Sequence, residues 1–385
     1  MPVPLPTADE VKVAPPDAEE VRMIVGGVAA AVAPPGGLTG LQKMMIGSIC
    51  ESMTGFVVPV TRLPRLGPDE FGRALANRDA AFRTRMVHWM LLCELVLKPL
   101  PEEVTARVER YAAELGVEDD IMRVARRMAR GSYGLALMDF KRSGYMDTWD
   151  PKQTEHLHTS GELHDALQEC VDDPALVQRW AALTECPPGS LGQAVARFYA
   201  ARGFAFPGAP GSAPPLLAQH DWVHVLADYG STVESEIEVF AFIARANDDP
   251  RAFSLLAMVV SLFETGYLAK GAGLFEYDPG HLSQAGAEEQ MAVRLADAMY
   301  RGAKCAAAHE HGIDLLAIDW FEHAGRAIDD VRAELGVVPK SERAVDAGSV
   351  GPWQRGGITP YQYAAGQRAA EAAGRAYDSY GAVPA

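Results

Sequence analysis

One stretch of the chain combines a helical spacing with metal-binding side chains: Gln219-His220-Asp221-Trp222-Val223-His224, followed after eleven intervening residues by Glu236. His220 and His224 are four positions apart, which places both imidazoles on one face of a helix. Asp221 lies roughly 100° around the axis from His220. Nitrogen and carboxylate donors without a thiolate suit zinc or another borderline first-row ion. We therefore predict one divalent metal in a helical protein, with His220, Asp221, His224 and Glu236 as ligands.

Glu236 can join this site only if the helix ends before it. An unbroken helix would place Glu236 roughly 18 Å along the axis from His224, too far to share an ion. Gly230 is suited to a left-handed C-terminal cap, and residues 231–234 (Ser-Thr-Val-Glu) have the pattern of a capping box that begins a new helix. We expect this second helix to fold back and present Glu236 to the histidines. The alternative is a surface pair of histidines beside unrelated acidic residues.

The spacing His220-Asp221-x-x-His224-x11-Glu236 resembles the signature of the coenzyme Q biosynthesis protein 4 family, an all-helical group in ubiquinone synthesis. Two flanking segments are similar to that family as well. They are Pro188-Gly189-Ser190-Leu191-Gly192 with the following Ala196-Arg197-Phe198-Tyr199, and the segment 328–337 (IDDVRAELGV). The resemblance spans roughly residues 184–337, which is under half of the chain.

The resemblance implies a substrate with an aromatic head and a polyprenyl tail. It also implies a head-group step in which a ring carboxyl is lost and the position is hydroxylated. Asp221 and Glu236 would alternate between ligand and base, while the ion polarises a ring oxygen. Zinc suits the Lewis-acid step, and iron or manganese would replace it if the metal is redox-active.

A strongly apolar segment, residues 252–269, is the candidate site for the isoprenoid chain. Its apolar residues lie almost all round a helix, which is typical of a central core helix or of the wall of an apolar cavity. Because relatives are thought to hold an isoprenoid between helices, the resemblance favours lipid contact by Leu256, Val260 and Phe263.

Two other functions stay open. The first is a non-catalytic, isoprenoid-binding scaffold that organises other biosynthetic enzymes around a structural metal. The second is an HD-type metal phosphohydrolase. Such enzymes use an upstream histidine, an HD pair and a distant aspartate, and the chain has candidates in that order: His164, His220-Asp221 and Asp248. The phosphohydrolase requires neither His224 nor Glu236, whereas the metal site described above uses both. No nucleophile elbow, phosphate-binding lysine loop or dinucleotide motif is present in the sequence.

The predicted fold is all-α, with a helical metal-binding domain at the C-terminal side and a separate N-terminal helical bundle. We divide the chain into a Pro-rich, extended or disordered leader (1–37), an N-terminal helical module (38–146), a polar join (147–186), the metal-binding domain (187–338) and a Gly/Ala-rich tail (339–385) that wraps a partner subunit or remains loose. Within the module, helices are expected at 39–53, at 69–97, from Pro101 to Leu115, and from Asp119 onward. A bundle of this kind suits dimerisation or partner docking, so we expect a homo-oligomer.

The composition limits the location and the partners. A formal net charge of −16 argues against nucleic acid and against electrostatic docking on an anionic bilayer, so any membrane contact would be local and hydrophobic. The five cysteines are scattered without a CxxC pair, as is usual in a reducing compartment. Acidic residues precede the first apolar stretch, unlike in a signal peptide. We expect a cytoplasmic bacterial protein, peripheral at most to the inner face of the membrane.

Overall fold

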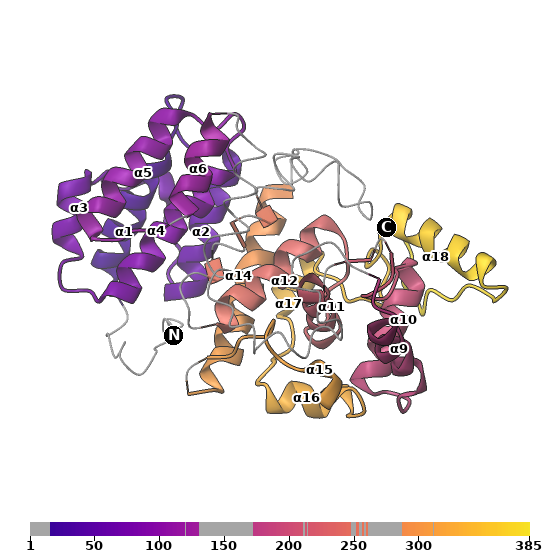
Figure 1. Cartoon of the computed structure of the whole chain (residues 1–385). Coiled ribbons are helices and arrows are strands. Elements are labelled where there is room, and N and C mark those ends of the chain that lie inside the picture. The colour runs from indigo at the N-terminus through magenta and orange to yellow at the C-terminus, as the bar shows by residue number, and fades with distance from the viewer. Residues whose placement is uncertain are drawn as a thin grey trace.

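The computed structural model describes residues 16–119, 121–130, 172–210, 212–213, 215–247, 252–253, 256–257, 259–260, 287–310 and 312–385. In these residues the regular structure consists of fifteen α-helices and two short 3-10 helices, without a β-strand (Figure 1). The prediction of an all-α fold is confirmed. None of the helices in the described part of the chain has the length and apolar character needed to cross a membrane.

The N-terminal helices form a bundle. They are α1 (Ala18–Val32), α2 (Gly40–Thr54), the 3-10 helix η1 (Val60–Arg62), α3 (Pro68–Ala74), α4 (Ala80–Leu95), α5 (Glu102–Leu115) and α6 (Ile121–Ala129). Local signals set several of these boundaries: Thr39 and Gln42 form a capping box before α2, and Gly116 ends α5 in the left-handed conformation. The prediction of a single helix over residues 69–97 is wrong. Two helices replace it, because the side chain of Asp79 accepts a hydrogen bond from the backbone of Phe82 and starts α4.

The expected Pro-rich leader contains a buried helix, so the prediction for residues 18–32 is also wrong. The Asp17 carboxylate accepts hydrogen bonds of 2.9 Å from the backbone N–H groups of Glu19 and Glu20 and thereby caps α1. Among the described residues, Pro16 directly precedes the N-cap Asp17, and Pro34 directly follows the C-cap Ala33. Val25 and Val28 are fully buried, which makes α1 part of the bundle core.

The second half of the chain is a helical layer around one long helix. Its elements are α9 (Pro174–Ala181), the 3-10 helix η3 (Ala182–Glu185), α10 (Leu191–Arg202), α11 (Pro215–Leu226), α12 (Val233–Ala246), α14 (Ala287–Ala307), α15 (Trp320–His323), α16 (Ile328–Glu334), α17 (Glu342–Asp346) and α18 (Pro360–Ala372). Helix α14 packs against α12 on one side and against α2 of the bundle on the other (Figure 1). The Ser52 hydroxyl donates to the sulfur of Met299 across the second contact, at 3.3 Å. One buried hydrophobic cluster therefore runs from the bundle into the half with the metal motif.

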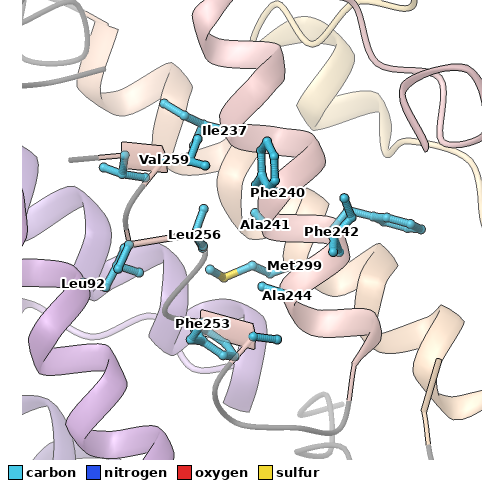
Figure 2. Packing of buried hydrophobic residues seen from close by; sticks show 14 of the residues in the cluster. Leu92, Ile237, Phe240, Ala241, Phe242, Ala244, Phe253, Leu256, Val259 and Met299 are labelled. Carbon is cyan, nitrogen blue, oxygen red and sulfur yellow. The ribbon is translucent and has the colours of Figure 1, made fainter. Parts of the chain in front are cut away.

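The residues proposed to contact an isoprenoid lie in this cluster where they are described. Residues 252–253, 256–257 and 259–260 are helical, and Leu256 and Val260 are fully buried. Figure 2 shows Leu256 and Phe253 near Leu92 of α4 and Met299 of α14, with α12 alongside. Phe263 lies outside the described residues. The packing of Leu256 and Val260 is that of a core helix between the two halves of the protein.

The C-terminal segment is folded onto the chain itself, which differs from the expected loose or subunit-wrapping tail. Helix α18 packs against α10 (Figure 1). The Tyr377 hydroxyl donates to the carbonyl of Ala201 at 2.8 Å, and the Tyr377 and Tyr363 rings meet edge to face with centroids 5.2 Å apart. The aromatic residues that punctuate this segment thus serve as its contacts with the same chain.

A pair of glycine substitutions tests the placement of α1. A Cβ atom at Gly26 would lie 2.1 Å from the backbone carbonyl oxygen of Pro64, whereas a Cβ at Gly47 in α2 would meet nothing within 4 Å. We expect Gly26→Ala to lower the free energy of unfolding by about 1–3 kcal/mol through overpacking. Gly47→Ala should instead raise it by about 0.5–1 kcal/mol, the gain in helix propensity. Urea denaturation measures both, and a Gly26→Ala protein as stable as the wild type would contradict the packing of α1.

Candidate metal centre

Helices α11 and α12 are antiparallel neighbours joined by a short turn, which brings Glu236 back toward the histidines. The details of the turn differ from the prediction. The left-handed residue is Asp228, with φ 62°, and not Gly230. The N-cap of α12 is Thr232, whose hydroxyl accepts a hydrogen bond of 3.4 Å from the backbone of Ser235. Gly230 is required for another reason: a Cβ there would lie 2.8 Å from the Cα of Gly357, so its role is a close approach between two backbones.

Both imidazoles converge on one carboxylate oxygen. The Nε2 atoms of His220 and His224 lie 3.3 and 3.2 Å from Oε2 of Glu236. Oδ1 of Asp221 is 3.7 Å from Nε2 of His220, and a candidate ligand atom from each of Asp221, His220 and His224 lies within 4.8 Å of the others. The structure therefore brings all four sequence-predicted ligands into one cluster, with Glu236 nearer to His220 than Asp221 is.

The cluster is buried, and its charges are strongly coupled. His224 is fully buried and Glu236 is 4% exposed. Burial alone would raise the pKa of Glu236, but His224 and His220 hold it well below its ordinary value. Burial alone would lower the pKa of His220, but Asp221 and Glu236 outweigh this effect and raise it to about 9. Burial raises the pKa of Asp221 despite the opposing effect of the two histidines. Glu236 is thus the firmly ionised carboxylate of the cluster.

The imidazole rings are held from the sides. Phe198 of α10 stacks on His224 with centroids 5.5 Å apart, and Phe240 of α12 stacks on His220 at 5.0 Å. Nδ1 of His220 is hydrogen-bonded to the carbonyl oxygen of Leu217. A backbone carbonyl on one ring nitrogen is the usual arrangement for a metal-binding histidine, because it leaves the other nitrogen for the ion. Nδ1 of His224 is buried and has no hydrogen-bond partner among the described residues.

Tyr199 of α10 adds a contact that the sequence pattern did not single out. Its hydroxyl donates a hydrogen bond of 2.6 Å to Oδ2 of Asp221. Burial and the neighbouring Asp221 carboxylate raise the pKa of Tyr199 well above its ordinary value, so the hydroxyl keeps its proton. Tyr199 belongs to the flanking segment that resembles the family, but no local spacing relates it to Asp221.

A buried arginine connects the centre to the C-terminal segment. The guanidinium of Arg202 lies 3.7 Å from the centroid of Phe198, the ring that stacks on His224. It donates hydrogen bonds of 3.1 and 2.8 Å to the carbonyls of Pro352 and Gly357. Burial lowers the pKa of Arg202 to about 9, although Asp221 and Glu236 oppose this effect. The C-terminal segment is therefore part of the support of the α11–α12 turn.

The two flanking segments also meet near the site. Ser190 caps α10, and the backbone N–H of Ile328 in the second segment donates to the carbonyl of Gly189 in the first, at 3.3 Å. The N–H of Leu191 donates to the carbonyl of Arg326, just before the second segment, at 2.9 Å. Arg332 of α16 donates to the carbonyls of Leu226 and Val225 at the end of α11, at 2.7 and 3.2 Å. Both segments thus anchor the helices that hold the four candidate ligands.

The remaining histidines give no second cluster in the described part of the chain. His309 is half-buried beyond the end of α14, and His323 ends α15 beside Arg326. His164 and Asp248, which the phosphohydrolase alternative needs, lie outside the described residues. Among those residues, the only group of three or more acidic, histidine or cysteine side chains placed to share an ion is the one with His220, Asp221 and His224.

Comparison of the chain with protein-family models, curated proteins and solved structures finds no match in any of the three.

A charge-removing pair on α10 tests the support from the C-terminal segment. Arg202→Met would remove the donor to the carbonyl of Pro352 and one of the donors to that of Gly357, which keeps its bond from the Ser231 N–H, and we expect a loss of about 2–4 kcal/mol in the free energy of unfolding. Arg197→Met, on the exposed side of the same helix, removes only a cation–π contact with Tyr380 of the C-terminal segment and should lower it by at most about 1 kcal/mol. Denaturation curves give both values. Limited proteolysis should also release the C-terminal segment from the Arg202→Met protein alone, and equal stability of the two variants would refute this role.

Proposed function

We propose that the protein binds one divalent metal ion through His220, His224 and Glu236, with Asp221 as the fourth side chain. The observation that supports this is the convergence of the two Nε2 atoms on one Glu236 oxygen, at 3.3 and 3.2 Å. Ligand atoms about 2.0–2.1 Å from a tetrahedral ion lie about 3.3 Å from one another. The two separations from Glu236 to the imidazoles match this value, and that from Asp221 to His220, at 3.7 Å, is slightly longer. Iron and manganese bind the same donor atoms, and elemental analysis distinguishes them from zinc.

The residues of the site suit acid–base work on a bound oxygen. When bound, the ion supplies Lewis-acid polarisation of a phenolate or carboxylate oxygen. Glu236 is firmly ionised and would hold the ion through Oε2, whereas Asp221, whose pKa is raised by burial, can accept and hold a proton on the side of His220. Phe198 and Phe240 stack on the two rings; His224 is fully buried, whereas the side chain of His220 is 14% exposed.

For the substrate we propose a polyprenylated aromatic compound, and for the reaction a head-group step of decarboxylation and hydroxylation in quinone biosynthesis. The support is the family resemblance of His220-Asp221-x-x-His224-x11-Glu236 and of the two flanking segments, which the structure brings to the same helices. Leu256 and Val260 remain candidates for isoprenoid contact only if the core helix opens, since both are fully buried.

A non-catalytic scaffold is the second candidate, favoured by the buried core that joins the bundle to the metal-bearing half. In either case we propose a cytoplasmic protein that self-associates and contacts the membrane at most peripherally, with biosynthetic enzymes as its partners.

Elemental analysis of the natively purified protein tests the metal site. We expect near-stoichiometric metal in the wild type and its loss in His220→Ala/His224→Ala, because both imidazole ligands are then absent. His309→Ala/His323→Ala removes two histidines away from the site and should keep the metal. Absence of metal from the wild type, or equal loss in both double variants, would refute the proposed site. The element found separates Lewis-acid from redox chemistry.

Mass spectrometry of organic extracts tests the substrate class. We expect a prenylated aromatic compound in extracts of the native protein. Glu236→Gln should retain this compound while the reaction stops if the protein is an enzyme. If the protein is a scaffold, Glu236→Gln should still bind both the compound and the partner enzymes, and the amount of the biosynthetic product should not change. Extracts free of any prenylated compound would contradict the substrate proposal.

A further inference from the structure

Tyr199 lies beside the metal centre without being a candidate ligand itself. Its hydroxyl donates to Oδ2 of Asp221 at 2.6 Å, and both residues are buried. The other carboxylate oxygen, Oδ1, is the one that faces the cluster, 3.7 Å from Nε2 of His220. The two oxygens of Asp221 therefore have different neighbours.

We propose that Tyr199 is a positioning residue for Asp221: it occupies Oδ2, so that Asp221 binds the ion through Oδ1 alone, and it thereby sets the metal affinity of the centre. This inference rests on the proposed metal site. A fixed hydrogen bond on one oxygen opposes the rotation of the carboxylate that would bring both oxygens to the ion. Such outer contacts orient the ligands and tune the affinity of metal centres in general.

The ring of Tyr199 is held firmly enough for this role. Its centroid lies 5.1 Å from that of Trp180 and 5.4 Å from that of Phe206, and Phe204 meets it edge to face at 5.7 Å. Packing on several sides leaves the ring one orientation, and the hydroxyl is then fixed by the backbone of α10. That helix is itself anchored at its start by the Ser190 cap and by the bond from Leu191 to Arg326.

Loss of the hydroxyl would change Asp221 in two ways. The buried Oδ2 atom would lose the one hydrogen bond that the structure shows for it, and the carboxylate would become free to rotate toward His220 or to offer both oxygens to the ion. Both changes oppose the arrangement in which Oδ1 alone joins the other ligands. The ring itself is unchanged in Tyr199→Phe, so the aromatic packing is retained.

Zinc titration of the metal-free full-length protein, in competition with a chromogenic chelator, tests the proposal. We expect Tyr199→Phe to bind zinc about 10- to 100-fold more weakly than the wild type. In the Asp221→Ala background, Tyr199→Phe should have no further effect, because its action passes through that carboxylate. Tyr377→Phe is the matched control: it removes another hydroxyl bonded to α10, at the carbonyl of Ala201, and should bind zinc like the wild type.

The outcomes separate three explanations. Unchanged affinity in Tyr199→Phe, or an equal loss in the Asp221→Ala background, would overturn the positioning role. A lower melting temperature of the metal-free Tyr199→Phe protein with unchanged zinc affinity would also overturn it, since the hydroxyl would then be only structural. A wild type that binds no zinc at the two histidines would instead remove the metal site itself.

Cobalt gives a second readout that stability does not affect. The visible absorption of protein-bound Co²⁺ depends on coordination number and geometry. If Tyr199 keeps Asp221 bound through one oxygen, the Tyr199→Phe spectrum should differ from that of the wild type, and the Tyr377→Phe spectrum should not. Identical spectra for the wild type and Tyr199→Phe would contradict the proposal.

Discussion

The contact between Glu236 and the two imidazoles across the α11–α12 turn is the interaction on which the arrangement of the C-terminal half depends. A carboxylate that is 4% exposed costs too much free energy unless positive groups or an ion neutralise it. The turn must therefore close tightly enough to bring α12 back along α11. Its closure in turn requires the backbone approach of Gly230 to Gly357 and the Arg202 bonds to the C-terminal segment. Residues that are far apart in the chain thus stabilise one short turn.

The N-terminal bundle and the metal-bearing half are parts of one packed structure. Helix α14 contacts α2 on one side and α12 on the other, and the apolar residues around Leu256 lie between the two halves. Because Phe240 of α12 belongs to this core and also stacks on His220, the core reaches the edge of the candidate centre. A change in the packing of the bundle against α14 would therefore shift the imidazole rings.

The sequence predicted those features that depend on local spacing. His220 and His224 share a helical face because they are four residues apart, and Thr39 and Gly116 mark helix ends by cap chemistry. The error in the N-terminal segment has a physical cause as well: Pro16 and Pro34 flank α1, and a Pro-rich composition predicts an extended chain although proline is also common next to helix ends.

The supporting residues of the site could not be predicted from local spacing. Tyr199 and Arg202 meet the site only after α10 packs on α11, and Gly230 meets Gly357 only in the folded chain. Long-range contacts of this kind leave no periodic signal in one sequence. The same holds for the folded C-terminal segment, whose Gly/Ala-rich composition resembles that of a loose tail.

The most direct test of the central claim is anomalous diffraction from crystals of the protein grown with zinc, measured on both sides of the zinc absorption edge. We predict the strongest anomalous peak between the Nε2 atoms of His220 and His224 and the carboxylate of Glu236, with Oδ1 of Asp221 facing it. Zinc peaks only at surface residues, with His220 and His224 still paired to an ion-free Glu236, would contradict it.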